Sequence, residues 1–175
     1  MTAVYVTAGV LAAWVLWWWF VGRNVPRLPP LSVDEDDPRM LAAMEQARNS
    51  LDRFRQLVDR GDPQDPGEVQ AQVKVGFVSS SGTTEHLWAE VLELGESGVS
   101  VRYLTPPVTH TGQLERLHEH SLEDVEDWAV FTEAGRIHGG YTQRAMFAIA
   151  RETHGDLPPE LAEQEARYVP PAESA

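Results

Sequence analysis

The first 22 residues carry no charged side chain, and this constrains the chain more than any other feature of its sequence. Ala3 to Val21 reads AVYVTAGVLAAWVLWWWFV, which contains neither a charge nor a proline. About 20 helical residues at roughly 1.5 Å each cross the roughly 30 Å of a bilayer's hydrocarbon core. The run therefore predicts a transmembrane helix over residues 1–22.

Two other interpretations of this run are open. A buried core helix needs a large domain around it, and this chain is small. A cleaved signal peptide begins with a positive region and ends with small residues at its cleavage site. The chain begins with Met1 and Thr2 and the run closes on Trp17, Trp18, Trp19 and Phe20, so a transmembrane helix is favoured over both.

The flanks of the run predict its orientation. Arg23 and Arg27 follow the span and no cation precedes it, which by the positive-inside rule places the C-terminal side in the cytoplasm. The expected location is the inner (plasma) membrane, crossed once. Residues 23–37 contain Pro26, Pro29 and Pro30 before an acidic run, and these prolines favour a stiff, extended linker.

The chain beyond this span is acidic, because all 27 Asp and Glu and all 14 Lys and Arg follow it and the net charge is −13. Such a surface repels phosphate backbones, so nucleic acid is not an expected partner. The absence of cysteine excludes disulfides and thiolate metal sites. The expected partners are the membrane, through Ala3 to Val21, and an unidentified protein.

An amphipathic helix is predicted after the linker. Asp37 is suited to be its N-cap, Pro38 to be its first residue, and Gly61 with Pro63 to end it. Apolar residues recur at steps of four and three, which makes one stripe. This stripe either docks on the domain's own sheet or forms a coiled-coil seam in a dimer. Its members are Met40, Met44, Ala47, Leu51, Phe54 and Val58.

Alternating apolar and polar residues predict a sheet after this helix. Glycine-bearing turns separate its strands, and a helix capped by Thr142 follows, with a short helix after Pro159 and disorder from Tyr168 onward. The expected fold class is α+β, a small curved antiparallel sheet flanked by helices and preceded by the transmembrane helix. The predicted strands cover residues 69–77, 85–94, 99–104 and 128–132, and the second helix covers residues 142–151.

Three motifs in a fixed order carry a resemblance to a known family. The chain resembles the bacterial family called domain of unknown function 2314 over roughly Met40 to Ile149. The resemblance implies a domain over residues 38–152, with 153–175 as a tail, but no chemistry. Residues 105–120 depart from the family, whose members have a shorter loop there. The motifs are Glu85-His86-Leu87-Trp88, Glu126-Asp127-Trp128, and Gly139-Gly140-Tyr141-Thr142 with Arg144.

These motifs supply the candidate site residues, each with a structural alternative. Glu85 and His86 are an acid–base pair by type, but neighbours on a strand point to opposite faces, which favours a structural histidine beside Trp88. Asp127 either orients His86 or His138 or bonds its own turn beside a core Trp128. The full candidate set is Glu85, His86, Trp88, Asp127, Trp128, His138, Gly139, Gly140, Tyr141 and Thr142.

The glycine motif and the histidines have alternatives of the same kind. Gly139, Gly140, Tyr141 and Thr142 either bind an anion at a helix N-terminus or simply allow a turn with positive φ. His110, His118 and His120 have metal-binding side chains, but no third ligand follows at a recognisable spacing. No metal and no cofactor is expected.

Two functions remain open. The first is a binding or regulatory module held at the membrane by the N-terminal span. The second is a hydrolase-like enzyme that gathers His86, Asp127, His138 and Tyr141 in one cleft. Their separation in space discriminates between the two, because proton transfer needs hydrogen-bond reach.

Overall fold

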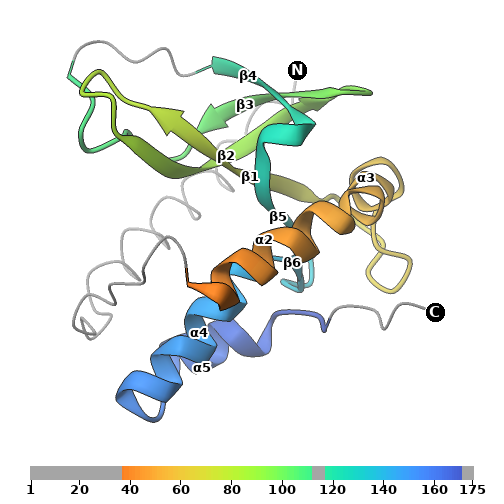
Figure 1. Cartoon of the computed structure of the whole chain (residues 1–175). Helices are drawn as coiled ribbons and strands as arrows, with labels where there is room; N and C mark the ends of the chain where they lie inside the picture. Colours follow the sequence, from red (N-terminus) through yellow and green to blue (C-terminus); the bar gives the residue numbers. More distant parts are fainter. Residues whose placement is uncertain (1–36, 112–116, 171–175) are drawn as a thin grey trace, which may run out of the picture.

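The computed structural model describes residues 37–111 and 117–170, which form one antiparallel sheet of six strands with four α-helices (Figure 1). The predicted α+β class with an antiparallel sheet is confirmed. The elements are α2 (Pro38–Asn49), α3 (Leu51–Arg60), β1 (Gln70–Val78), β2 (Thr84–Leu94), β3 (Gly98–Tyr103), β4 (Leu117–Ser121), a 3-10 turn (Leu122–Asp124), β5 (Val125–Phe131), β6 (Ile137–Gly139), α4 (Tyr141–His154) and α5 (Pro159–Ala166).

The predicted transmembrane helix over residues 1–22 and nearly all of the predicted linker lie outside the described residues. Among the helices that the structure describes, none has the length and apolar content needed to cross a membrane.

The sheet has the strand order β4-β3-β2-β1-β5-β6; on β1 its two faces differ in burial, whereas β5 and β6 are buried on both faces. On β1, Val73 and Val75 are fully buried, whereas Lys74 between them is half-buried. The buried face continues onto β2 through Leu87 and Ala89 and packs under α2 and α3. In Figure 1, α2 crosses β5 and β6, and α4 and α5 lie beyond α2. The alternation seen in the sequence therefore defines the core.

The predicted single helix is two helices, which corrects the sequence interpretation. Ser50 breaks it with φ −110° and ψ 14°, and the Trp128 indole Nε1 donates to the Ala47 carbonyl and the Ser50 hydroxyl at 3.1 Å each. The bend lets both helices follow Trp128, whose ring lies 5.4 Å from that of Phe54. The stripe docks on the domain's own sheet, as one of the two alternatives predicted.

Two short strands escaped prediction. β4 reads Leu-His-Glu-His-Ser and β6 has three residues, so neither shows the apolar alternation that marks a half-buried strand. Both are outer strands of the sheet. The predicted cap Thr142 is also wrong, because α4 begins at Tyr141 with Gly140 as its N-cap.

The predicted disorder from Tyr168 onward is wrong for residues 168–170. This segment runs parallel to β6, where the Ile137 amide donates to the Arg167 carbonyl at 2.9 Å and the Val169 amide donates to the Ile137 carbonyl at 2.8 Å. The Tyr168 ring packs edge-on against Phe147 at 5.9 Å. The segment therefore covers the β6 edge of the sheet, and we call residues 167–170 the tail strand.

The tail strand makes stability sensitive to alkaline pH. Burial, and then the nearby charge of Asp127, raise the pKa of Tyr168 from 10.0 to about 12. A group with a raised folded-state pKa stabilises the fold fully below its unfolded pKa and loses that contribution as the pH rises through the folded value. We expect the free energy of unfolding to fall as the pH rises from 10 toward 12 and part of this fall to be absent in Tyr168→Phe. Urea titrations over that range measure both, and superimposable profiles would contradict the prediction.

Candidate functional site

A cavity of about 330 Å³ lies where the end of α3, β6, the start of α4 and the tail strand meet. Three stretches that are distant in the sequence, residues 53–64, 128–144 and 169–170, contribute to its wall, so it forms only in the folded domain. We call it the arginine pocket. Its lining residues are Arg53, Asp62, Pro63, Gln64, Trp128, Arg136, His138, Gly139, Tyr141, Arg144, Val169 and Pro170.

The arginine pocket is positively charged in a chain that is strongly negative. Arg53 comes from α3, Arg136 from the turn before β6, and Arg144 from the first turn of α4. Asp62 is the one carboxylate in the lining, so three positive charges face one negative charge there. The chain as a whole carries a net charge of −13. The arrangement concentrates positive potential at one concave place, which attracts anions.

Asp62 is already neutralised by its neighbours. It is 3% exposed, its Oδ2 lies 2.9 Å from His138 Nε2 and 3.1 Å from Arg136 Nη1, and its Oδ1 accepts from the Gln64 amide at 3.0 Å. Burial raises the pKa of this carboxyl, but the Gln64 and His138 hydrogen bonds and the charges of His138 and Arg136 outweigh burial and lower the pKa overall. Arg136 is therefore committed to Asp62.

The other two arginines are available to a ligand. Within residues 37–111 and 117–170, neither Arg53 nor Arg144 forms an ion pair. Arg144 is oriented by one neutral bond, because its Nη1 donates to the Val169 carbonyl at 3.2 Å. Tyr141 stands beside them with its ring edge-on to Trp128 at 5.8 Å. Two cations and a phenol thus border the same cavity.

Asp127 occupies the N-terminus of α4 from inside the protein. Its Oδ1 accepts from the Trp128 amide at 2.8 Å and the Tyr141 amide at 3.1 Å, and its Oδ2 accepts from the Thr142 amide and hydroxyl at 2.7 Å each. Burial raises the pKa of this carboxyl, and the bonds from Thr142, Trp128 and Tyr141 oppose the rise. The helix start therefore has its anion already.

These contacts decide two of the alternatives that the sequence left open. Asp127 bonds backbone beside a core Trp128 and holds neither His86 nor His138, so the turn-aspartate interpretation is correct. Gly139 and Gly140 have φ of 75° and 62°, as the positive-φ interpretation predicts.

The Glu85-His86-Leu87-Trp88 motif lies away from the arginine pocket. The Glu85 carboxylate accepts from the Val108 and Thr109 amides at 2.7 Å each, so it holds a loop rather than a ligand. His86 Nδ1 lies 2.7 Å from Glu126 Oε2, and Glu126 is therefore the partner that the sequence did not identify. Trp88 is half-buried on the face opposite the core.

The four residues of the hydrolase hypothesis do not share a cleft. β1 and β5 lie between β2 and β6, so His86 and His138 are three strand spacings apart, about 14 Å at roughly 4.8 Å per spacing. The strand register also places them on opposite faces, because His138 pairs with core-facing Val130 while His86 neighbours core-facing Leu87. Only His138 and Tyr141 reach the arginine pocket.

The histidines of the other sheet edge are bonded to aromatic neighbours. The Tyr103 hydroxyl lies 2.9 Å from His120 Nε2, and the His118 ring lies 4.6 Å from the Tyr103 ring. In the part of the chain that the structure describes, no group of three or more His, Cys, Asp or Glu side chains is arranged to hold a metal ion.

Sequence reasoning missed most of the arginine pocket. Asp62 lies in a proline-rich turn and reads as a turn residue, and Arg53 reads as the solvated side of an amphipathic helix. Arg136 and the tail strand belong to segments without periodicity. Arg144 stands out in the sequence only as part of a motif. The one signal is the presence of basic residues beside that motif in an acidic chain. The spacing of the arginines along the chain does not indicate that they meet in space.

The fold and the cavity together define a class of protein, a small single-sheet α+β domain with a cation-lined pocket at one sheet edge. The chain belongs to the family domain of unknown function 2314, described as an uncharacterized protein conserved in bacteria, whose model matches residues 37–169. The resemblance predicted from the three motifs is thereby confirmed, and the match extends into the tail strand, as far as residue 169. No curated protein and no solved structure gives a match.

Proposed function

We propose that the protein is a membrane-anchored binding module whose arginine pocket takes a small anionic ligand bearing a carboxylate or phosphate group. The observation that carries the proposal is the convergence of three arginines on one cavity in a chain that has 27 acidic and only 14 basic residues. On such a surface, a random concave site would be lined mainly by carboxylates. Guanidinium groups bind carboxylate and phosphate through paired hydrogen bonds, which suits this ligand class.

The size and order of the pocket support a small ligand. Its volume of about 330 Å³ lies at the lower end of the range for small-molecule sites, roughly 300–1,000 Å³. Arg144 is held in place by the Val169 carbonyl, so its orientation needs little ordering on binding. A preorganised cation favours specific binding over loose ion pairing.

The anchor in this proposal is the run Ala3 to Val21, with the domain on the cytoplasmic side of the inner membrane. Its support is the uncharged length of the run and the arginines that follow it. The chain has no cysteine, so a single cysteine at exposed Glu93 gives a clean topology test in intact cells. Labelling of Glu93→Cys by a membrane-impermeant maleimide only after lysis is the expected result, and labelling of intact cells would contradict the cytoplasmic placement.

Hydrolysis is the second candidate, and binding is favoured over it. His138 and Tyr141 line the pocket, but His138 is 7% exposed and its Nε2 is bonded to Asp62. A general base must reach the proton that it abstracts. Loss of a hydrolytic activity in His138→Asn, with anion binding retained, would restore this candidate.

The anion-binding proposal predicts a selective effect of two substitutions. In full-length protein held in lipid nanodiscs, we expect Arg53→Ala and Arg144→Ala each to weaken the binding of citrate or inorganic phosphate by about tenfold or more, since a charged hydrogen bond contributes roughly 1.5–3 kcal/mol. Isothermal titration calorimetry at low ionic strength measures the dissociation constants.

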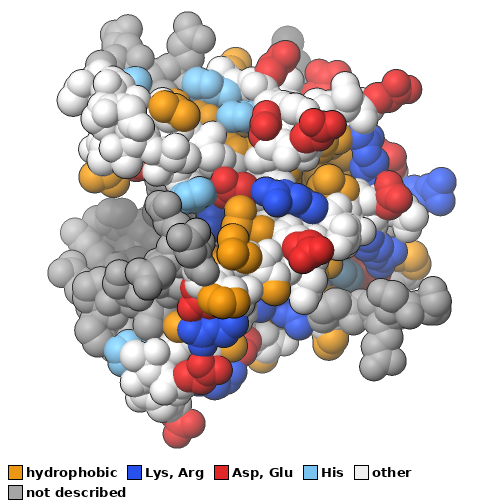
Figure 2. All heavy atoms as spheres, in the orientation of Figure 1, with side chains coloured by type: hydrophobic (Ala, Val, Ile, Leu, Met, Phe, Trp, Pro, Cys, Tyr) orange, Lys and Arg blue, Asp and Glu red, His pale blue; other side chains and the backbone are white. Residues whose placement is uncertain are grey.

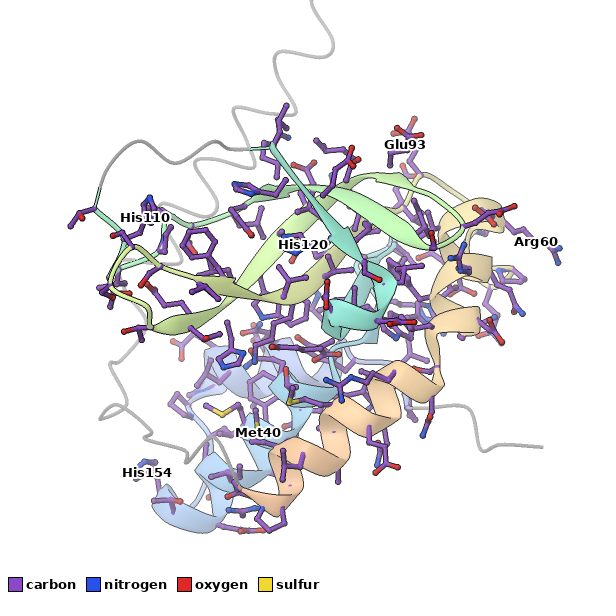
Figure 3. All side chains as sticks on the ribbon, turned by 45° about the horizontal axis from the view of Figure 1, so that its top comes forward. Met40, Arg60, Glu93, His110, His120 and His154 are labelled. Carbon is purple, nitrogen blue, oxygen red and sulfur yellow. The ribbon has the colours of Figure 1, made fainter. Side chains whose placement is uncertain are left out.

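Arg60→Ala is the matched control for this test. Arg60 lies on the same helix as Arg53, is exposed, and points away from the domain in Figure 3. Its removal lowers the net charge equally without touching the pocket. Equal losses of affinity in Arg60→Ala and Arg53→Ala would show that the effect comes from the net charge of the protein and not from the pocket. Failure of both citrate and phosphate to bind the unmodified protein would reject the proposal.

A further inference from the structure

One end of the sheet is poor in charged side chains. The β1–β2 turn region, residues 78–84, and the described part of the loop that follows β3, residues 104–111, contain no Asp, Glu, Lys or Arg. The loop continues to Arg116, and its charged residues are Glu115 and Arg116, whose charges cancel. In residues 78–84 and 104–111, serine, threonine, glycine and proline take the place of charged residues. We call these two segments the tip.

The tip also exposes apolar side chains. Val78 is 68% exposed, Leu104 44% and Val108 91%, and Leu117, which lies outside the tip at the start of the neighbouring β4, is 63% exposed. These four are among six large hydrophobic side chains that are exposed in the described residues. Exposed apolar groups gathered in one place mark contact surfaces more often than scattered ones do. The upper left of Figure 2, where the tip lies in Figure 1, is mostly white and orange, whereas red and blue gather elsewhere.

The two segments of the tip are fastened to each other. Glu85 accepts from the Val108 and Thr109 amides and, at 2.6 Å, from the Thr109 hydroxyl. The Ser80 hydroxyl accepts from the Thr111 amide at 2.9 Å. The Glu85 carboxylate, which follows the β1–β2 turn, is therefore turned onto backbone amides, and Val108 is held outward on a fixed loop.

We infer that the tip rests on the bilayer surface and inserts Val78 and Val108 into the headgroup region. This inference depends on the proposed anchor, which keeps the domain near a bilayer. Anionic headgroups repel the acidic remainder of the domain, so the end that is poor in charge and has no excess of carboxylates approaches them at least electrostatic cost. Hydroxyl side chains with protruding valines suit this boundary, where apolar groups are buried and polar groups stay hydrated. A protein partner at the same end is the competing explanation and would leave the valines out of pure lipid.

Site-specific fluorescence on the full chain tests the inference. The absence of native cysteine allows one environment-sensitive dye at Val78→Cys, Val108→Cys or Glu93→Cys, in vesicles that contain nitroxide-bearing lipids. Glu93 is the control, because it is exposed and lies at the opposite end of the sheet from His110 of the tip (Figure 3). We expect dyes at positions 78 and 108 to lose roughly half of their emission or more, as insertion by about 5–10 Å implies, and the dye at position 93 to lose little.

A second variant tests whether quenching of the dye at position 78 requires insertion of the tip rather than only nearness to the bilayer. Val108→Asp places a charge on the loop, and we expect it to reduce the quenching of a dye at position 78. Vesicle flotation separates this inference from the anchor. A chain that floats with vesicles while dyes at positions 78 and 93 are quenched equally overturns the contact of the tip and leaves the anchor standing. A chain that does not float overturns both.

Discussion

Replacement of Asp127 by alanine is expected to lower the free energy of unfolding by about 3–5 kcal/mol, because one buried carboxylate serves four donors. The amides of Trp128, Tyr141 and Thr142 and the hydroxyl of Thr142 all donate to it. Its side chain is fully buried, so water does not replace the lost acceptor. A buried unsatisfied donor costs roughly 1–3 kcal/mol, and a lost helix cap is of the same order. Pulse proteolysis of the full chain in urea measures the change.

Two further variants separate the cap from general charge effects. Asp59→Ala removes an exposed carboxylate from α3, and we expect a change within about 0.5 kcal/mol. Asp127→Asn keeps the shape but offers one oxygen, and its amide group faces donors, so an intermediate loss is expected. A loss for Asp127→Ala no larger than that for Asp59→Ala would show that α4 starts without this carboxylate.

Asp127 also explains why the proposed anion site is built from arginines rather than from a helix N-terminus. The amides of Tyr141 and Thr142 at the start of α4 donate to the internal Asp127 carboxylate, so they are not available to an incoming anion. The positive charge of the arginine pocket comes from three arginines, which α3, the turn before β6 and α4 contribute. The proposed anion binding therefore depends on the docking of the tail strand, whose Val169 carbonyl holds Arg144.

The core was predictable and the pocket was not, for a physical reason. The period-two alternation over β1 reflects which of its side chains are buried, and the glycine-bearing turns mark where strands end. Both are local properties, so the sequence predicts the strands. The bend at Ser50 depends on the indole of Trp128, which lies 78 residues further along the chain. Likewise the pairing of Asp62 with His138 joins residues 76 positions apart. Long-range contacts of this kind produce no periodic pattern in the sequence. Sequence patterns therefore predict the helices and strands but not which of their residues come into contact.

Gly139→Ala is expected to be the other large effect, with a loss of about 3 kcal/mol or more. Gly139 has φ of 75°, and a Cβ there would lie 2.2 Å from the Trp128 carbonyl oxygen and 2.5 Å from its ring. The oxygen belongs to the backbone of β5 and accepts from the Gly140 amide at 2.7 Å, so it does not move away without breaking the sheet edge. Trp128 is itself 1% exposed and closes the core under α2 and α3. The added methyl group would therefore push on the core and on the pocket wall together.

Gly82→Ala is the control that isolates overlap from backbone strain. Its φ of 80° is nearly the same, but nothing lies within 4 Å of an added Cβ. Backbone strain alone costs roughly 1–2 kcal/mol, so Gly82→Ala should lose about that much and Gly139→Ala clearly more. Pulse proteolysis compares the two, and anion titration of the folded fraction follows the pocket, because Gly139 lines it. Equal losses of stability in the two variants would mean that β5 and Trp128 move to accommodate the methyl group. The strand-to-helix turn beside the arginine pocket would then not be rigid.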